Sequence, residues 1–246
     1  MDSTESTNDK IQPKPSRGRL TTYLALLIIA IQVLISLVTY PFLPAMVPSH
    51  WNAAGQIDAY MPKLFNAILF PLMSIGIYFL IRGLYAISPR LGNQPKNANL
   101  EVINIILVGV LLLLLVVQLT TTAVALGVPV DVTLVIAISM SLLFIFIGNY
   151  MVKLRRNFWG GIRTPWTLAS DTVWERTHRF GGWLFVMGGL LMLVLSFIPA
   201  LRIWAIIIIP LTVALVPVVY SYFAYQRYVV QGKEPLSPPF DTGSEV

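Results

Sequence analysis

Residue types that could carry out chemistry are few in this sequence and gather in two segments, the first of which spans residues 40–63. His50, Asn52 and Asp58 could coordinate a metal ion or bind a ligand there. One histidine with one carboxylate is a weak metal pattern, whereas Asn and Asp often bond their own backbone in turns. Four prolines predict an irregular loop rather than a helix. We therefore expect a structural cap, with Trp51 at the level of the lipid headgroups.

The second segment, residues 148–182, holds Asp171, Glu175 and His178 at positions i, i+4 and i+7, which share one helix face. Glu-x-x-His spacing occurs in carboxylate metal sites and could also serve acid–base chemistry. A di-metal site takes further carboxylates, and the predicted helices supply none. We favour an ion pair between Glu175 and Arg179 with His178 as an interfacial hydrogen-bonding residue. We expect no catalytic residue, metal or cofactor.

The same segment carries a helix start and an interfacial composition. Ser170 or Thr172 can begin a helix as its N-cap, and Thr172 has capping-box spacing to Glu175. Tryptophans and six cations suit the surface of an anionic inner leaflet.

The amino-acid composition indicates whether water or lipid surrounds the elements that position these two segments. Of the 246 residues, 56% are hydrophobic and only 11% charged, with no cysteine and a mean hydropathy of +0.74. Soluble domains carry about 25% charged residues. A soluble enzyme, a disordered chain and a disulfide-stapled module are therefore excluded, and a multi-pass membrane protein remains.

Six uncharged apolar runs are long enough to cross a bilayer as helices. We predict an all-α integral membrane protein of six transmembrane helices, with Pro71, Pro210 and Pro217 kinking their helices. The runs are Leu20–Tyr40, Leu64–Ile81, Val102–Leu126, Val132–Val152, Phe180–Ala200 and Ile203–Tyr225.

The distribution of Lys and Arg predicts the orientation. Fifteen lie in the two termini and in the second and fourth loops, and only Lys63 and Arg202 lie on the opposite side. Because short cytoplasmic loops are rich in Lys and Arg, we expect both termini in the cytoplasm. Topology then explains the net charge of +6, and we expect no direct binding to nucleic acid.

This topology divides the chain into four parts. We expect residues 1–19 to form a disordered cytoplasmic tail and residues 20–98 to hold two spans with the extracytoplasmic His-Trp-Asn loop. We expect residues 99–230 to form a four-span region with a cytoplasmic loop at 153–180, and residues 231–246 to form a second disordered tail.

Both polar segments resemble known families. The run Pro48-Ser49-His50-Trp51-Asn52-Ala53-Ala54-Gly55 is similar to a domain family of unknown function marked by Pro-x-His-Trp-Asn-x-x-Gly after a first span. The second segment resembles the conserved segment of the SdpI immunity-protein family. The residues that carry this second resemblance are Arg163-Thr164-Pro165-Trp166-Thr167-Leu168 and Trp174-Glu175-Arg176-Thr177-His178-Arg179.

The resemblance implies a prokaryotic cell-membrane protein that gives immunity to, or senses, a secreted peptide toxin and captures a cytoplasmic transcriptional repressor. Membrane lipids, a toxin peptide outside and a repressor inside are the implied partners. We expect binding through His50, Trp51, Asn52, Gly55, Asp58, Asn157, Arg163, Thr164, Pro165, Trp166, Thr167, Trp174, Glu175, His178 and Arg179.

Two other functions stay open from the residues. One is a transporter or exporter of a hydrophobic peptide or lipid, which the kinked helices would suit. Proton coupling is disfavoured because the runs hold no ionisable group in their central portions. The other is a membrane-interface hydrolase using Glu175 and His178.

Overall fold

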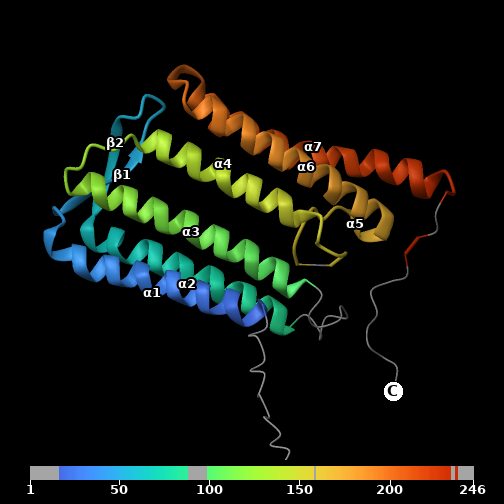
Figure 1. Ribbon diagram of the computed structural model, residues 1–246, viewed down its shortest axis with the longest axis horizontal. Helices are drawn as coiled ribbons and strands as arrows, with labels where there is room; N and C mark the ends of the chain where they lie inside the picture. Colours follow the sequence, from blue (N-terminus) through green and yellow to red (C-terminus); the bar gives the residue numbers. More distant parts are fainter. Residues whose placement is uncertain (1–16, 88–98, 158, 234–235, 238–246) are drawn as a thin grey trace, which may run out of the picture.

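Six long helices make up most of the computed structural model, which describes residues 17–87, 99–157, 159–233 and 236–237 (Figure 1). Each helix is long and apolar enough to cross a membrane, so the predicted fold class is confirmed. Residues 1–16, 234–235 and 238–246 of the predicted tails lie outside the described residues, as do the cations Lys10, Lys14, Arg90 and Lys96, whereas residues 17–19 belong to the first helix. The helices are α1 Arg17–Thr39, α2 Lys63–Ile87, α3 Leu100–Ala125, α4 Val132–Met151, α6 Asp171–Ser196 and α7 Pro199–Tyr225.

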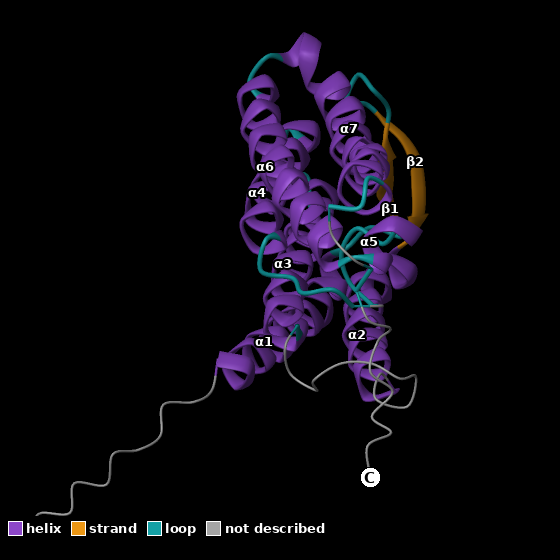
Figure 2. Cartoon of the chain, turned by 90° about the vertical axis from the view of Figure 1, so that its right-hand side faces the viewer, coloured by secondary structure: helices purple, strands orange, loops and turns teal. Residues whose placement is uncertain are grey.

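A β-hairpin lies between α1 and α2, where we predicted an irregular loop, and that prediction was wrong. A short 3₁₀ turn, Tyr40–Phe42, leads into β1 Met46–Trp51, which pairs antiparallel with β2 Ile57–Pro62. Figure 2 shows this hairpin at the edge of the helical bundle. A two-stranded sheet consists only of edge strands, so its prolines need not donate to a ladder. Pro48 adjoins an irregularity in the pairing, and Pro62 ends β2.

The start of α6 confirms one of the two predicted helix starts. The helix begins at Asp171, nine residues before the apolar run predicted as the span at residues 180–200. Ser170 is its N-cap, and its side chain accepts a hydrogen bond from the Val173 amide at 3.3 Å. Thr172 therefore lies inside the helix, and the expected capping box with Glu175 is not formed. The first turns of α6 are polar on one side, so hydropathy alone does not detect them.

Prolines do not interrupt the long helices. Pro71 lies inside α2, and both Pro210 and Pro217 lie inside α7, each within one continuous helix. Among the described residues there are also two short elements, the helix α5 Pro165–Ala169 and a π-helical turn, Gln226–Val230, after α7.

The helices form two groups of three, and the main contact between the groups is α3 against α4. In the first group α1 packs on α3 and α2, and in the second α6 lies between α4 and α7 (Figure 1). Each group has its own apolar core. The first includes Ala25, Ile28, Leu107 and Leu111, and the second includes Met192, Ala205, Ile209 and Val213.

Glycines bring α4 and α6 into close contact. A Cβ atom on Gly148 would lie 2.6 Å from the carbonyl oxygen of Gly182, and one on Gly182 would lie 2.8 Å from that of Gly148. Small residues allow such backbone approach in membrane helices, where lipid offers little hydrophobic driving force for association. The pair fixes the position of α6 relative to α4.

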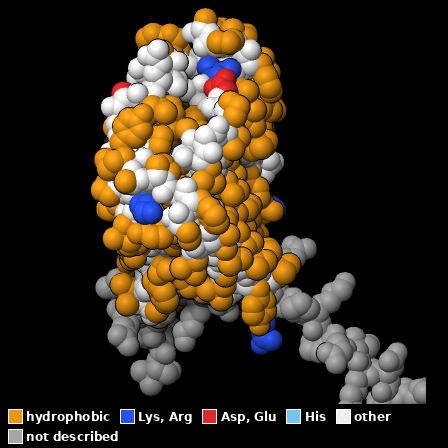
Figure 3. Space-filling model, turned by 90° about the vertical axis from the view of Figure 1, so that its left-hand side faces the viewer, with side chains coloured by type: hydrophobic (Ala, Val, Ile, Leu, Met, Phe, Trp, Pro, Cys, Tyr) orange, Lys and Arg blue, Asp and Glu red, His pale blue; other side chains and the backbone are white. Residues whose placement is uncertain are grey.

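The side-chain amide of Gln118 on α3 joins that helix to the backbone and a hydroxyl of α1 inside the first group. Gln118 Nε2 donates to the Gln32 carbonyl oxygen and to Ser36 Oγ, both at 2.9 Å. Many large hydrophobic side chains are exposed, and Figure 3 shows them over most of the face that it presents. This distribution suits a bundle with lipid around it.

Candidate functional site

The hairpin end brings together the first set of predicted site residues. His50 Nδ1 lies 2.6 Å from Asp58 Oδ1 across the two strands, and both side chains are substantially exposed. Asn52 Oδ1 accepts from the amides of Ala54 and Gln56 at 2.9 and 3.0 Å, so the expected structural cap is present at Asn52. Asp58 does not bond its own turn as we expected, because it bonds His50 instead. Within the described part of the chain no group of three His, Asp or Glu residues could hold a metal ion.

A second charged pair lies beside the hairpin and was missed from the sequence. Arg202 is almost fully buried, and its Nη1 donates to Asp131 Oδ2 at 2.6 Å and to Thr133 Oγ1 at 2.9 Å. Its Nε donates to the Ser196 carbonyl oxygen at 2.6 Å, so one guanidinium joins the ends of α4, α6 and α7. The sequence feature that could have predicted this pair is that Asp131 and Arg202 are isolated charged residues at the ends of apolar runs.

The Asp131 carboxylate also begins α4 as its N-cap. It accepts from the Leu134 amide at 3.0 Å. Burial alone would raise the pKa of Asp131, but the hydrogen bonds from Leu134, Arg202 and Thr133 outweigh it and lower the pKa below its ordinary value. The carboxylate is therefore held in its charged form.

A cavity of roughly 420 Å³ lies beneath the hairpin, which we call the hairpin cavity. Its lining comes from both helical groups. Trp51 and Asn52 contribute from the hairpin end, Asn66 and Thr121 from α2 and α3, and Ile136 from α4. The sequence indicated only the hairpin side of this cavity, because the helix residues that complete its lining are far away in the chain.

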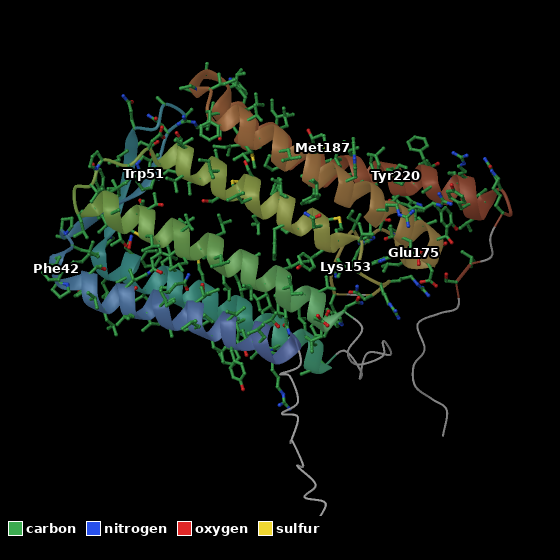
Figure 4. The ribbon with its side chains drawn as sticks, viewed as in Figure 1. Phe42, Trp51, Lys153, Glu175, Met187 and Tyr220 are labelled. Carbon is green, nitrogen blue, oxygen red and sulfur yellow. The ribbon has the colours of Figure 1, made fainter. Side chains whose placement is uncertain are left out.

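The chain between α4 and α6, described at residues 152–157 and 159–170, forms the opposite end of the bundle together with the first turns of α6. We call this region the connector. Figure 4 shows Trp51 near one end and Lys153 and Glu175 near the other. Trp174 is fully buried here, its Nε1 donating to the Leu154 carbonyl oxygen at 2.7 Å, and its ring stacks on His178 with centroids 4.0 Å apart. Because its single N–H donor is hydrogen-bonded, the Trp174 indole can be buried without leaving an unpaired polar group, and it forms the centre of the connector's core.

His178 fixes the connector through both ring nitrogens. Nε2 accepts from the Ile162 amide at 3.0 Å, and Nδ1 lies 2.9 Å from the Trp174 carbonyl oxygen. These partners assign the neutral tautomer with the proton on Nδ1. His178 therefore has a positioning role, and neither nitrogen is turned to the surface.

Gly161 is required beside that imidazole. Its φ is +104°, a backbone conformation that favours glycine, and a Cβ atom there would overlap His178 Nε2. The same Cβ atom would lie 3.2 Å from the Trp174 ring. The connector thus passes directly over the stacked pair.

The Arg-Thr-Pro-Trp-Thr-Leu run folds as α5 and packs on α7. Thr164 and Thr167 form a reciprocal capping box, with Pro165 at the first helical position. Thr164 Oγ1 also lies 3.0 Å from Ser221 Oγ of α7. Trp166 meets Tyr222 edge to face at 5.2 Å, so α5 has both polar and aromatic contacts to α7.

Asn157 and two neighbours close the rest of the connector. Asn157 Oδ1 accepts from the amides of Trp159 and Gly160 at 2.8 and 2.7 Å. Arg156 binds Asp171 through Nε at 2.6 Å, which ties the connector to the first residue of α6. The C-terminal segment also reaches this point. Ser237 Oγ accepts from the Asp171 amide at 2.7 Å, and the Ser237 amide donates to the Ala169 carbonyl oxygen at 3.2 Å.

The predicted acidic face of α6 does not form one site. Asp171 binds Arg156 and His178 is buried, whereas Glu175 is exposed. Within the described chain, the expected ion pair between Glu175 and Arg179 is absent. The connector therefore offers a buried core of Trp174, His178 and Thr167 beneath an exposed surface that includes Arg163, Glu175, Arg176 and Arg179. A fixed surface of this kind can bind a partner.

Six apolar helices, a hairpin at one end and a folded connector at the other define a multi-pass protein of the cell membrane. Comparison with known proteins gives two family matches. Residues 153–221 match the SdpI/YfhL protein family, and residues 27–75 match a domain of unknown function, DUF1648. The resemblance to SdpI-type proteins is thereby confirmed.

One curated relative matches over most of its length. The chain is 29% identical to Immunity protein SdpI of Bacillus subtilis (strain 168) over 210 residues, which cover 83% of this chain and 95% of that protein. No solved structure matches the chain. The shared length includes at least part of each helical group.

Proposed function

We propose that this protein protects the cell carrying it from a secreted peptide toxin, with the hairpin facing outside and the connector facing the cytoplasm. The observation that supports this most is the similarity to Immunity protein SdpI along 95% of that protein. The excess of Lys and Arg at the connector end supports the orientation.

The toxin binds at the hairpin end in this proposal. His50, Trp51, Asn52, Gly55 and Asp58 form or border a hairpin that is fixed by the Asn52 cap. The Asp58 pair with His50 adds a polar rim. A fixed hairpin with an apolar cavity beneath it can bind a peptide without first becoming ordered, which reduces the entropic cost of binding.

The connector binds a cytoplasmic transcriptional repressor. Its exposed cations, among them Arg163 and Arg179, lie above a core in which Trp174 and His178 use their polar atoms in internal hydrogen bonds. A toxin that binds the hairpin end more tightly in one arrangement of the two helical groups would change the affinity of the connector for its partner.

Survival of toxin-producing cells tests the function. In Bacillus subtilis strain 168, the gene for Immunity protein SdpI is replaced by the gene for this chain, and viable cells are counted after growth into toxin production. We expect survival with the natural chain and killing with Trp166→Ala, because that variant loses the contact between Trp166 and Tyr222. Trp183→Ala is the matched control, since Trp183 is exposed on the apolar surface of α6.

Equal survival of Trp166→Ala and the natural chain, at equal amounts in the membrane, would contradict the role of the connector. Killing of cells that carry the natural chain would contradict the immunity itself. Fractionation of the same cells reports the repressor, which we expect in the membrane fraction with the natural chain and in the soluble fraction with Arg163→Ala.

A further inference from the structure

The hairpin cavity contains a buried hydrogen-bond donor that nothing in the structure satisfies. Asn66 of α2 is 2% exposed and lines the cavity, and its Nδ2 has no hydrogen-bond partner. An unpaired amide in an apolar site costs free energy, so such groups are usually paired in the working state of a protein. Asn66 is the feature that distinguishes this cavity from a simple gap between helices.

The walls around Asn66 are apolar, and the polar groups lie at the hairpin side. Phe70, Val117, Ile136 and Ile206 supply apolar surface from four different helices. Ser49, His50 and Asn52 border the cavity from the hairpin. Ligand sites typically combine predominantly apolar walls with a few placed polar groups and a volume of several hundred Å³.

We propose that the hairpin cavity binds one bulky apolar side chain of a peptide, together with a neighbouring backbone carbonyl that accepts a hydrogen bond from Asn66 Nδ2. This proposal rests on the proposed function, in that the ligand is the peptide class against which the protein gives immunity. A lipid acyl chain would fill the same walls but would leave the donor unpaired, so the observations favour a peptide.

The position of the cavity gives such a ligand a route of action. Asn66, Phe70 and Val117 belong to the first helical group, and Ile136 and Ile206 belong to the second. The two groups otherwise meet mainly where α3 packs on α4. A side chain held between them favours one relative arrangement, and the connector is attached to the second group through α4 and α6.

The absence of cysteine from the sequence allows a direct test. Ile136→Cys places a single thiol in the wall of the cavity, in the purified full chain in phosphatidylglycerol nanodiscs. The rate of its reaction with N-ethylmaleimide is measured against increasing N-acetyl-L-tryptophanamide, which has an indole ring and amide carbonyls. The comparator is 3-methylindole, which has the ring without a carbonyl. Leu142→Cys, on the exposed side of α4, is the control thiol.

We expect N-acetyl-L-tryptophanamide to protect Ile136→Cys but not Leu142→Cys. Adding Asn66→Leu to Ile136→Cys should raise the half-protecting concentration of N-acetyl-L-tryptophanamide about three- to tenfold, the range expected for one hydrogen bond. The half-protecting concentration of 3-methylindole should stay unchanged. Ser74→Ala is the matched variant, because Ser74 is also buried and unpaired on α2 but does not line the cavity. It should change neither concentration.

Any one of four results would overturn the proposal. The first two are no protection by either probe and equal half-protecting concentrations for both probes in the protein with Asn66. The other two are no effect of Asn66→Leu on the amide probe and an equal effect of Ser74→Ala. This experiment and the survival experiment can fail separately. If the chain protects cells but the cavity binds neither probe, the proposed function stands and the proposed peptide site in the hairpin cavity is refuted.

Discussion

Replacing Gly161 with alanine tests whether the connector is held by its contact with the stacked Trp174 and His178 rings. Two costs add in this variant. Alanine at a φ of +104° has a backbone cost of about 1–3 kcal/mol. The added methyl group overlaps His178 Nε2, so the imidazole must move and the Ile162 amide loses its acceptor. A buried donor left unpaired costs about 1–3 kcal/mol.

Gly161→Ala should therefore lower the free energy of unfolding by about 2–6 kcal/mol, the sum of these two terms. Gly127→Ala is the matched control. Its φ is +84°, but no atom outside its immediate neighbours lies within 4 Å of the added Cβ, so only the backbone cost of about 1–3 kcal/mol applies. Unfolding by titration with sodium dodecyl sulfate in mixed micelles measures both variants.

A double-mutant cycle separates the two terms. In a His178→Ala background the overlap with the imidazole is gone and only the 3.2 Å approach to the Trp174 ring remains, so adding Gly161→Ala should cost less than it does in the natural chain. Limited proteolysis between residues 153 and 170 should also increase in Gly161→Ala and not in Gly127→Ala. Equal destabilisation by Gly161→Ala with and without His178, or equal values for the two glycine variants, would refute the reasoning.

Two further variants test the helix contacts. Gly148→Ala should destabilise the protein by about 1–3 kcal/mol because its methyl group meets the Gly182 carbonyl oxygen, whereas Gly76→Ala, which meets nothing within 4 Å, should be neutral or slightly stabilising in the same titration. Because the folded-state pKa of Asp131 is lowered, its pair with Arg202 stabilises the fold above the ordinary carboxyl pKa and is lost as pH falls through the lowered value. Melting temperatures measured from neutral pH into acid should therefore decrease less for Asp131→Asn than for the natural chain, and parallel curves would contradict this role.

Hydropathy was sufficient to predict the six long helices because lipid requires continuous apolar runs with internally bonded backbones. Hydropathy placed the start of the fifth span only at Phe180 because Asp171 and Glu175 make the first turns of α6 polar, whereas the capping residue Ser170 did indicate where the helix begins. The hairpin was missed because prolines are usually evidence against strands, although an edge strand tolerates them.

The candidate sites could be predicted only where the chemistry is local. The Asn52 cap is formed with residues two and four positions away, so a sequence pattern indicates it. The pairing of His178 with Ile162 and that of Arg202 with Asp131 join residues 16 and 71 positions apart. Composition could identify these side chains as unusual but could not identify their partners. Asn66 was missed for the same reason, since its place in the cavity depends on all the surrounding helices.

The contact of Ser237 with Asp171 and Ala169 has a practical consequence for anyone who handles this protein. Ending the chain at residue 233 would remove the Ser237 hydroxyl, which accepts a hydrogen bond from the Asp171 amide at the start of α6. That amide would then have to bond to water. If a purification tag were joined to such a shortened chain, a change in partner binding at the connector could be attributed to the tag although the truncation caused it. Affinity measurements on the connector should therefore keep the natural C-terminal residues and carry any tag beyond them.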